Sequence, residues 1–209
     1  MSDEELKKVA NEVRKGIVTG VHAAKSGHPG GSLGAADIMT YLYFEEMNVD
    51  PADPRKADRD RFVLSKGHAA PCYYAVLAAK GFISRDEYAN FRQLHSILQG
   101  HPDAKKVPGV DASTGSLGQG VSIAVGMALG AKHLGKDTKV FALVGDGITP
   151  GKVPPADHPL DRDPQGVIQP RRTRHRVTAG QMAPAHRQTE GQELARPVAE
   201  AVREALRHG

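Results

Sequence analysis

The chain has 209 residues, of which 39% are hydrophobic and 5% aromatic, and this length suits one medium α/β domain or one domain with a tail. The formal net charge of +4 is mild, and the single cysteine, Cys72, excludes an internal disulfide bond and favours a reducing, cytoplasmic compartment. No segment has the apolar length of a membrane span or the apolar core of a secretory signal, so neither is expected.

Helices and strands are expected to alternate from the N-terminus onward. Apolar residues recur at helical spacing and predict a helix over roughly residues 3–25. A glycine-rich turn at 30–34 opens a second apolar helix that runs through Met47. A short apolar run then predicts a strand at 61–65, and an alanine-rich segment predicts a helix at 69–80.

The alternation continues through the middle of the chain. Ser84 and Glu87 have the spacing of a capping box, which predicts the start of a short helix. Small and apolar residues predict a helix over 118–134, and the run at 139–144 is typical of a buried strand. That strand ends in the Gly-Asp-Gly sequence of residues 145–147.

Residues 148–209 differ sharply in composition from residues 1–147. They hold one Lys, nine Arg, eight of the 14 prolines and no aromatic residue. Frequent prolines disfavour regular structure, so we expect a largely disordered tail with a single helix at 193–207. Residues 1–147 are therefore the expected domain, and residues 148–209 an atypical tail rich in Pro and Arg.

Three histidines lie in glycine-flanked segments. His28 is within KSGHPGGSLG, His68 is within SKGHA directly after the first predicted strand, and His101 is within GHP. An imidazole titrates near neutral pH, which suits proton transfer or hydrogen bonding to a sugar hydroxyl. A strand, a Gly-His pair and a helix start together indicate a phosphate site. The alternative for each is a turn with an incidental histidine.

Two further motifs favour a ligand site. The segment STGSLGQG at 113–120 leads into a predicted helix, and its glycines allow a ligand to approach the backbone closely. Asp146 follows a predicted strand between two glycines, a position that suits a Mg²⁺ ligand. An ordinary helix entry and an ordinary turn are the respective alternatives.

Taken together, these five motifs resemble the transketolase family in order and spacing. The resemblance covers nearly all of residues 3–147, including RFVLSKGHAAPCYYAVLAAKG and STGSLGQGVSIAVGMALG. It implies an α/β fold with a doubly wound, mostly parallel sheet of the thiamine-diphosphate-binding type, incomplete at its C-terminal side. It also implies transfer of a two-carbon ketol unit between sugar phosphates, with thiamine diphosphate and Mg²⁺ as cofactors, in the pentose phosphate pathway.

The resemblance also implies roles for individual residues. His28 and His101 are similar to family histidines that contact the sugar substrates, His28 also assisting proton transfer, and His68 to the one that binds the cofactor diphosphate. Asp146 resembles the first protein ligand of Mg²⁺. The remaining implied cofactor contacts are Gly115, Ser116, Leu117 and Gly147.

In this family, a glutamate from a second domain activates the cofactor, and that domain lies outside this sequence. The resemblance therefore implies a C-terminal transketolase chain or domain as partner, in a homodimer or a heterotetramer. The sequence departs from the family directly after Gly147, where an acidic residue and a later Asn are expected. Ile148 follows instead, and no Asn occurs downstream. An inactive, truncated or frame-shifted homologue is thus the alternative function.

A remote alternative is a nucleic-acid-binding module that uses the basic cluster at 171–176. This cluster has no interleaved aromatic residues for base stacking, and charge runs are usually solvated. We therefore expect no nucleic-acid partner. A nicotinamide-binding site is also disfavoured, because no G-x-G-x-x-G follows the early strand and opens a helix.

Overall fold

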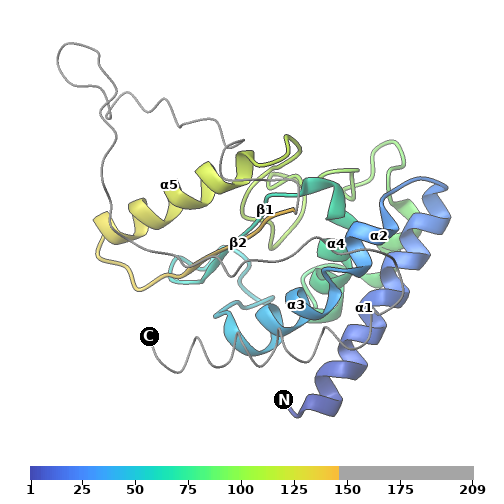
Figure 1. Ribbon diagram of the computed structural model, residues 1–209, viewed down its shortest axis with the longest axis horizontal. Coiled ribbons are helices and arrows are strands. Elements are labelled where there is room, and N and C mark those ends of the chain that lie inside the picture. Colours follow the sequence, from blue (N-terminus) through green and yellow to red (C-terminus); the bar gives the residue numbers. More distant parts are fainter. Residues whose placement is uncertain (146–209) are drawn as a thin grey trace, which may run out of the picture. The chain divides into compact units, whose positions relative to one another are not determined.

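The computed structural model describes residues 1–145 (Figure 1). The sequence predictions for Asp146, for Gly147, for the tail at 148–209 and for the helix at 193–207 lie outside the described residues. Among the helices that are described, none combines the length and apolar character needed to cross a membrane.

The N-terminal helix confirms the first prediction. Helix α1 (Asp3–Ala24) starts at Ser2, whose side chain and that of Glu5 form a capping box, an arrangement that satisfies free backbone N–H groups. Its buried side includes Val13 and Ile17, both fully inaccessible. This side packs against α3 (Ala36–Tyr41), α4 (Ala70–Lys80) and the short 3₁₀ helix η3 (Arg85–Asn90). It thereby anchors the helical layer.

The second predicted helix is not continuous. It is divided into α2 (Pro29–Leu33), α3 (Ala36–Tyr41) and the π-helical turn η1 (Leu42–Glu46). The interruption lies at Gly34 and Ala35, and a glycine at this position lowers the stability of a continuous helix. In η1, the Tyr43 ring is buried against Phe62 at a centroid distance of 5.7 Å, so core packing accompanies the wider turn.

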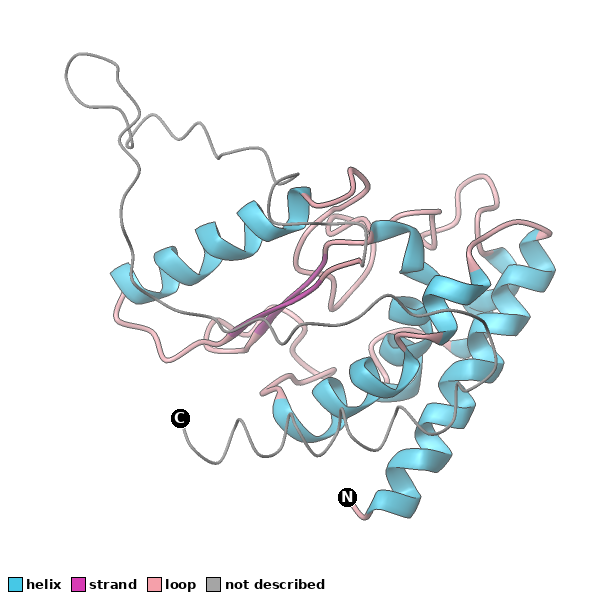
Figure 2. Ribbon diagram, viewed as in Figure 1, coloured by secondary structure: helices cyan, strands magenta, loops and turns pink. Residues whose placement is uncertain are grey.

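The described sheet consists of two parallel strands, β1 (Arg61–Leu64) and β2 (Val140–Leu143), which pair from Arg61↔Val140 to Leu64↔Leu143 (Figure 2). Parallel strands need a crossover connection, and here the connection includes two helices. β1 is mostly buried, whereas β2 is only partly buried, contrary to the prediction of a buried strand. The reason is that β1 is the only strand beside β2 within residues 1–145.

Helices cover both faces of β1. Phe62 and Leu64 belong to the main core with α1, α3 and α4 (Ala70–Lys80), whereas Val63 packs on the other face with Ala124 of α5 (Gln119–His133). This alternation is the period of two that a strand imposes. The described part therefore has the expected α/β architecture, with helices on both sides of a small parallel sheet.

Two predicted helices differ in detail from the expectation. α4 is preceded by the 3₁₀ turn η2 (Gly67–Ala69) and ends at Gly81, which has a left-handed φ of 100°. The segment after Ser84 forms a 3₁₀ helix, η3 (Arg85–Asn90). The Ser84 side chain accepts a hydrogen bond from the Asp86 backbone, one residue earlier than a capping box requires. The predicted helix is present there, but in the tighter form.

Candidate functional site

The first part of the site is the segment that follows β1. The strand leads through Ser65 and Lys66 into η2, which contains His68. Ligands of open α/β sheets bind outside the carboxyl ends of the strands, and this segment lies there. The Lys66 Nζ donates a hydrogen bond of 3.2 Å to the Gly31 carbonyl, which connects the segment with the one that carries His28.

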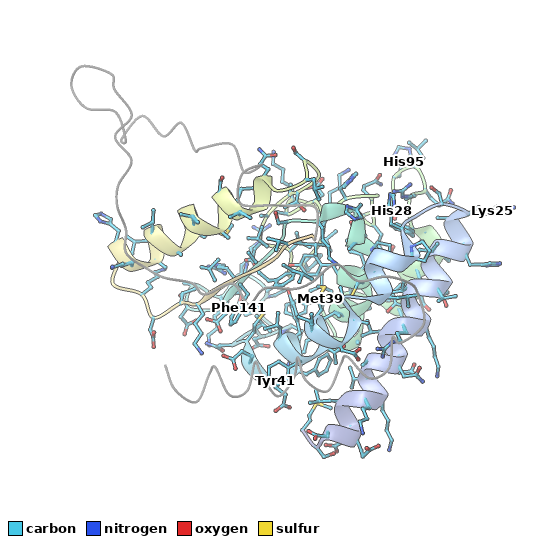
Figure 3. The ribbon with its side chains drawn as sticks, viewed as in Figure 1. Lys25, His28, Met39, Tyr41, His95 and Phe141 are labelled. Atoms are coloured by element: carbon cyan, nitrogen blue, oxygen red, sulfur yellow. The ribbon has the colours of Figure 1, made fainter. Side chains whose placement is uncertain are left out.

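His28 and His68 are neighbours although 40 residues separate them. Their ring centroids are 5.1 Å apart in an edge-to-face arrangement. His28 is exposed in the segment between α1 and α2, where Figure 3 shows it, and His68 is half-buried. Burial, followed by the charges of His28, Lys66 and His101, lowers the pKa of His68. A lowered pKa favours the neutral imidazole, which can donate or accept a hydrogen bond.

The third part of the site is the segment at 114–117, which lies against the backbone of Gly67. A β-carbon built on Gly67 would lie 2.9 Å from Thr114 Oγ1 and 3.0 Å from the Gly115 nitrogen. Only glycine therefore allows these two segments to approach so closely. Thr114 Oγ1 is buried and has no hydrogen-bond partner within residues 1–145. An unpartnered buried hydroxyl beside a glycine-lined contact indicates a place for a polar ligand.

His101 completes the group from the other side of the 114–117 segment. The Thr114 nitrogen donates a hydrogen bond of 3.3 Å to the Pro102 carbonyl. A β-carbon built on Gly115 would lie 3.6 Å from the His101 ring. The Tyr74 hydroxyl lies 3.0 Å from the His101 carbonyl and so fixes the backbone there. The His101 side chain is exposed. The structure thus brings all three predicted histidines to one end of β1.

The end of β2 lies at the same place. A β-carbon built on Gly145 would lie 3.8 Å from Leu117 Cδ1 and 3.8 Å from Lys66 Cβ. Ser116 and Leu117 are exposed. The predicted site residues that are described therefore adjoin the carboxyl ends of both strands, and the predictions for Asp146 and Gly147 apply to the residues that follow directly.

Sequence reasoning gave no role to Lys66, Thr114 or Arg92, which also build this site. Lys66 and Thr114 could have been found from their positions inside two of the motifs. Arg92 carries no such signal, because it reaches the His28 segment only through the fold. Its Nη1 donates a hydrogen bond of 2.7 Å to Ser26 Oγ, across 66 residues of sequence.

Replacing Arg92 with alanine is expected to loosen the segment that holds His28. The loss of the Ser26 hydrogen bond should lower the free energy of unfolding by about 1 kcal/mol. Amide hydrogen exchange should become faster at residues 25–29, while urea unfolding reports the global change. Arg85→Ala is the matched control, because Arg85 is exposed and 3.7 Å from its partner Glu12. Equal effects of the two substitutions would contradict a positioning role for Arg92.

The donors at this end of the sheet suit a diphosphate group. Lys66 provides a cation, His68 an imidazole, Thr114 a hydroxyl that lacks a described partner, and Gly115 a backbone N–H. Charged and neutral N–H and O–H donors together are the groups that phosphate oxygens need. A metal is a different matter, because residues 1–145 contain no group of three or more His, Cys, Asp or Glu side chains able to hold one.

Comparison with known proteins identifies the family to which this domain is similar. Residues 5–148 match the family described as transketolase, thiamine diphosphate binding domain. The chain is 46% identical over 147 residues to an apulose-4-phosphate transketolase subunit of Phocaeicola vulgatus, covering 70% of this chain and 52% of that protein. It is 47% identical over 143 residues to the transketolase of Homo sapiens, covering 68% of this chain and 23% of that protein.

A solved structure agrees with these relatives. The transketolase of Pichia stipitis in complex with sedoheptulose-7-phosphate superimposes with a TM-score of 0.66 at 37% identity, over 68% of this chain and 22% of that one. The chain therefore spans about half of the apulose-4-phosphate relative and about a quarter of the longer proteins.

Proposed function

Because the chain belongs to the transketolase family through its thiamine-diphosphate-binding domain, we propose that it binds thiamine diphosphate and Mg²⁺ and takes part in ketol transfer between sugar phosphates. The observation that carries this proposal is the meeting of His28, His68 and His101 at the carboxyl end of β1. Imidazoles at such a place suit both anion binding and proton transfer.

The residues of this chain divide between binding and proton transfer. Lys66, His68 and the segment at 114–117 would hold the cofactor, with the cation and the imidazole facing its diphosphate. When bound, thiamine diphosphate supplies a nucleophilic carbon and an electron sink for carbon–carbon cleavage. His28 and His101 are exposed on the open side of the site, where they would hold sugar hydroxyls and move protons.

For the metal, we assign Asp146 as the first protein ligand of Mg²⁺. Its neighbour in the sequence, Gly145, lies beside Lys66 and Leu117 of the proposed diphosphate site. Carboxylate and phosphate oxygens are the ligands that Mg²⁺ prefers. Gly147, the next residue, is proposed as a diphosphate contact.

A C-terminal transketolase chain or domain is the proposed partner. The chain spans only part of each relative, and the relative from Phocaeicola vulgatus is itself named as one subunit of a transketolase. His28, His101 and Leu117 are exposed in this chain, which supports a site that a second chain covers. The assembly would be a homodimer or a heterotetramer, and it would act on sugar phosphates.

Calorimetric titration with thiamine diphosphate in excess Mg²⁺ tests the proposal. We expect saturable binding, and we expect His68→Gln to weaken it about tenfold or more, because a hydrogen bond to a charged group contributes about 1.5–3 kcal/mol. His133→Ala is the control, since this exposed histidine ends α5. No binding by the chain, alone or with a C-terminal transketolase chain, would contradict the proposal.

The same titration carries a pH signature. The pKa of free His68 is lowered, chiefly by burial, and a bound diphosphate would raise that pKa, because an anion favours the protonated form. Binding would then take up a proton, so affinity should rise as pH falls from the bound-state pKa towards the free-state pKa, and should level off below it. The difference between wild type and His68→Gln cancels the titration of the ligand itself. An unchanged pH dependence in the variant would exclude this role.

A further inference from the structure

One cavity, which we name the basic depression, has none of the three predicted histidines in its walls. Its walls are residues 53–55, Arg59 and residues 104–111, and its volume is about 450 Å³. Arg59 lies just before β1, and Asp111 accepts a hydrogen bond from the Phe62 nitrogen near the start of the strand. The basic depression therefore adjoins the amino end of β1, whereas the histidine site adjoins its carboxyl end.

Cationic side chains predominate in the walls of the basic depression. These are Arg55, Arg59, Lys105 and Lys106, and two carboxylates, Asp53 and Asp111, accompany them. In the described part of the chain, the side chains of Arg55 and Lys105 make no hydrogen bond or ion pair. The Lys106 Nζ lies 3.9 Å from its partner, the Asp103 carboxylate, which is a long distance for an ion pair. Three cations are thus free or weakly paired at this surface.

The carboxylate of Asp111 does not neutralise Arg55, Lys105 or Lys106. One of its oxygens pairs with Arg59 and with Arg61, and the other accepts the hydrogen bond of 2.8 Å from the Phe62 nitrogen. Both oxygens are therefore in use inside the protein. Asp53 accepts a hydrogen bond of 3.3 Å from the Arg55 backbone nitrogen through one carboxylate oxygen. Asp53 is therefore the single carboxylate of the walls that has an oxygen free to interact with solvent or a ligand.

Arg59 adds a fixed positive charge at the base of this surface. The residue is only 9% exposed, and its hydrogen bonds and ion pair all use Nη1, to Asp111 and to the Asp60 carbonyl. Its Nε is buried without a partner among residues 1–145. A guanidinium held in place by a buried carboxylate loses little side-chain entropy when an anion binds, unlike a free surface lysine.

We propose that the basic depression is a second anion site that binds a phosphate group, as inorganic phosphate or as a small phosphate monoester. The cavity is large enough for such a ligand, and its charge excess suits a dianion. Arg55 and Lys105 come from two separate segments of the walls and would make the direct contacts, while Arg59 contributes charge from the base. Nothing in this proposal depends on thiamine diphosphate.

Titration of ¹⁵N-labelled protein with inorganic phosphate, at constant ionic strength set with chloride, tests the proposal. We expect saturable amide shifts at residues 104–111 and an increase in Kd of at least about tenfold in Arg55→Ala/Lys105→Ala, because each of the two cations would lose a charge-assisted hydrogen bond to the phosphate. The double variant Lys8→Ala/Lys132→Ala removes the same charge from exposed positions outside these walls. It should bind as wild type does.

Two further titrations distinguish this site from the proposed cofactor site and identify the source of the phosphate. His68→Gln should leave the shifts at 104–111 unchanged, whatever it does to thiamine diphosphate binding. Glycerol phosphate, titrated in the same way, should bind more tightly than inorganic phosphate if a monoester is the ligand, and more weakly if free phosphate is. Shifts confined to residues 66–68 and 114–117, or equal Kd values in the two double variants, would overturn the proposal.

Discussion

Gly120→Ala is expected to destabilise the protein by about 1–3 kcal/mol, the usual range for overpacking a filled site. A β-carbon at this position would lie 2.8 Å from Ser65 Cα and 2.8 Å from Ser65 Cβ. The Ser65 Cα is a backbone atom and Cβ is bonded directly to it, so neither atom can move away without a shift of the segment after β1. Helix α5 would have to shift relative to the sheet, and urea unfolding would measure the cost.

The same helix provides the control. A β-carbon added at Gly126 would have nothing within 4 Å in the described part of the chain. Gly126→Ala should therefore stabilise the protein by up to about 1 kcal/mol, because alanine is the better helix former. Opposite signs for two chemically identical substitutions would establish that α5 packs through Gly120. Stabilisation by both would contradict this packing.

This contact also bears on the proposed function. The Gly118 nitrogen donates a hydrogen bond of 3.3 Å to the Ser65 carbonyl, so the start of α5 and the segment that carries His68 are joined at this point. A shift of α5 would move residues 114–117 away from Gly67. We therefore expect Gly120→Ala to weaken thiamine diphosphate binding as well as folding, whereas Gly126→Ala should leave binding unchanged.

Asp111→Ala should have the largest effect on stability, about 3–5 kcal/mol, because it leaves the buried guanidinium of Arg59 without its counter-charge. Asp111 is the shared partner of Arg59 and Arg61, and its side chain is only 3% exposed. Burial raises the pKa of the Asp111 carboxyl, against the opposing effect of the Phe62 nitrogen and the two arginines. Thermal and urea unfolding would measure the loss.

Two companion substitutions make this prediction specific. Asp111→Asn keeps an acceptor for the Phe62 nitrogen but removes the charge, so its effect should be intermediate. Asp58→Ala removes an exposed carboxylate 3.5 Å from Lys56 and should cost less than about 1 kcal/mol, as exposed ion pairs usually do. If Asp111→Ala were as mild as Asp58→Ala, the buried pair would not support the start of β1.

The sequence predicted most elements for a local reason. Repeating apolar positions identified α1, segments rich in alanine and other small residues identified α4 and α5, and short apolar runs identified both strands, because such patterns are local properties of helix and strand. Two expectations differed from the structure where a side-chain contact is not recorded in the local sequence pattern. The Tyr43 ring packs into the core from a π-helical turn, and Ser84 bonds one residue earlier than its spacing suggested.

For the site, the sequence alone determined which residues are chemically suited: three histidines between glycines, and a family resemblance that the matched domain confirms. Only the tertiary structure decided that His28 lies 5.1 Å from His68 and that Arg92 holds the His28 segment. It also decided that Asp111 pairs with arginines 50 residues or more upstream. Such contacts join residues far apart in sequence, and no local periodicity records them, because they arise when the parallel strands and their covering helices pack.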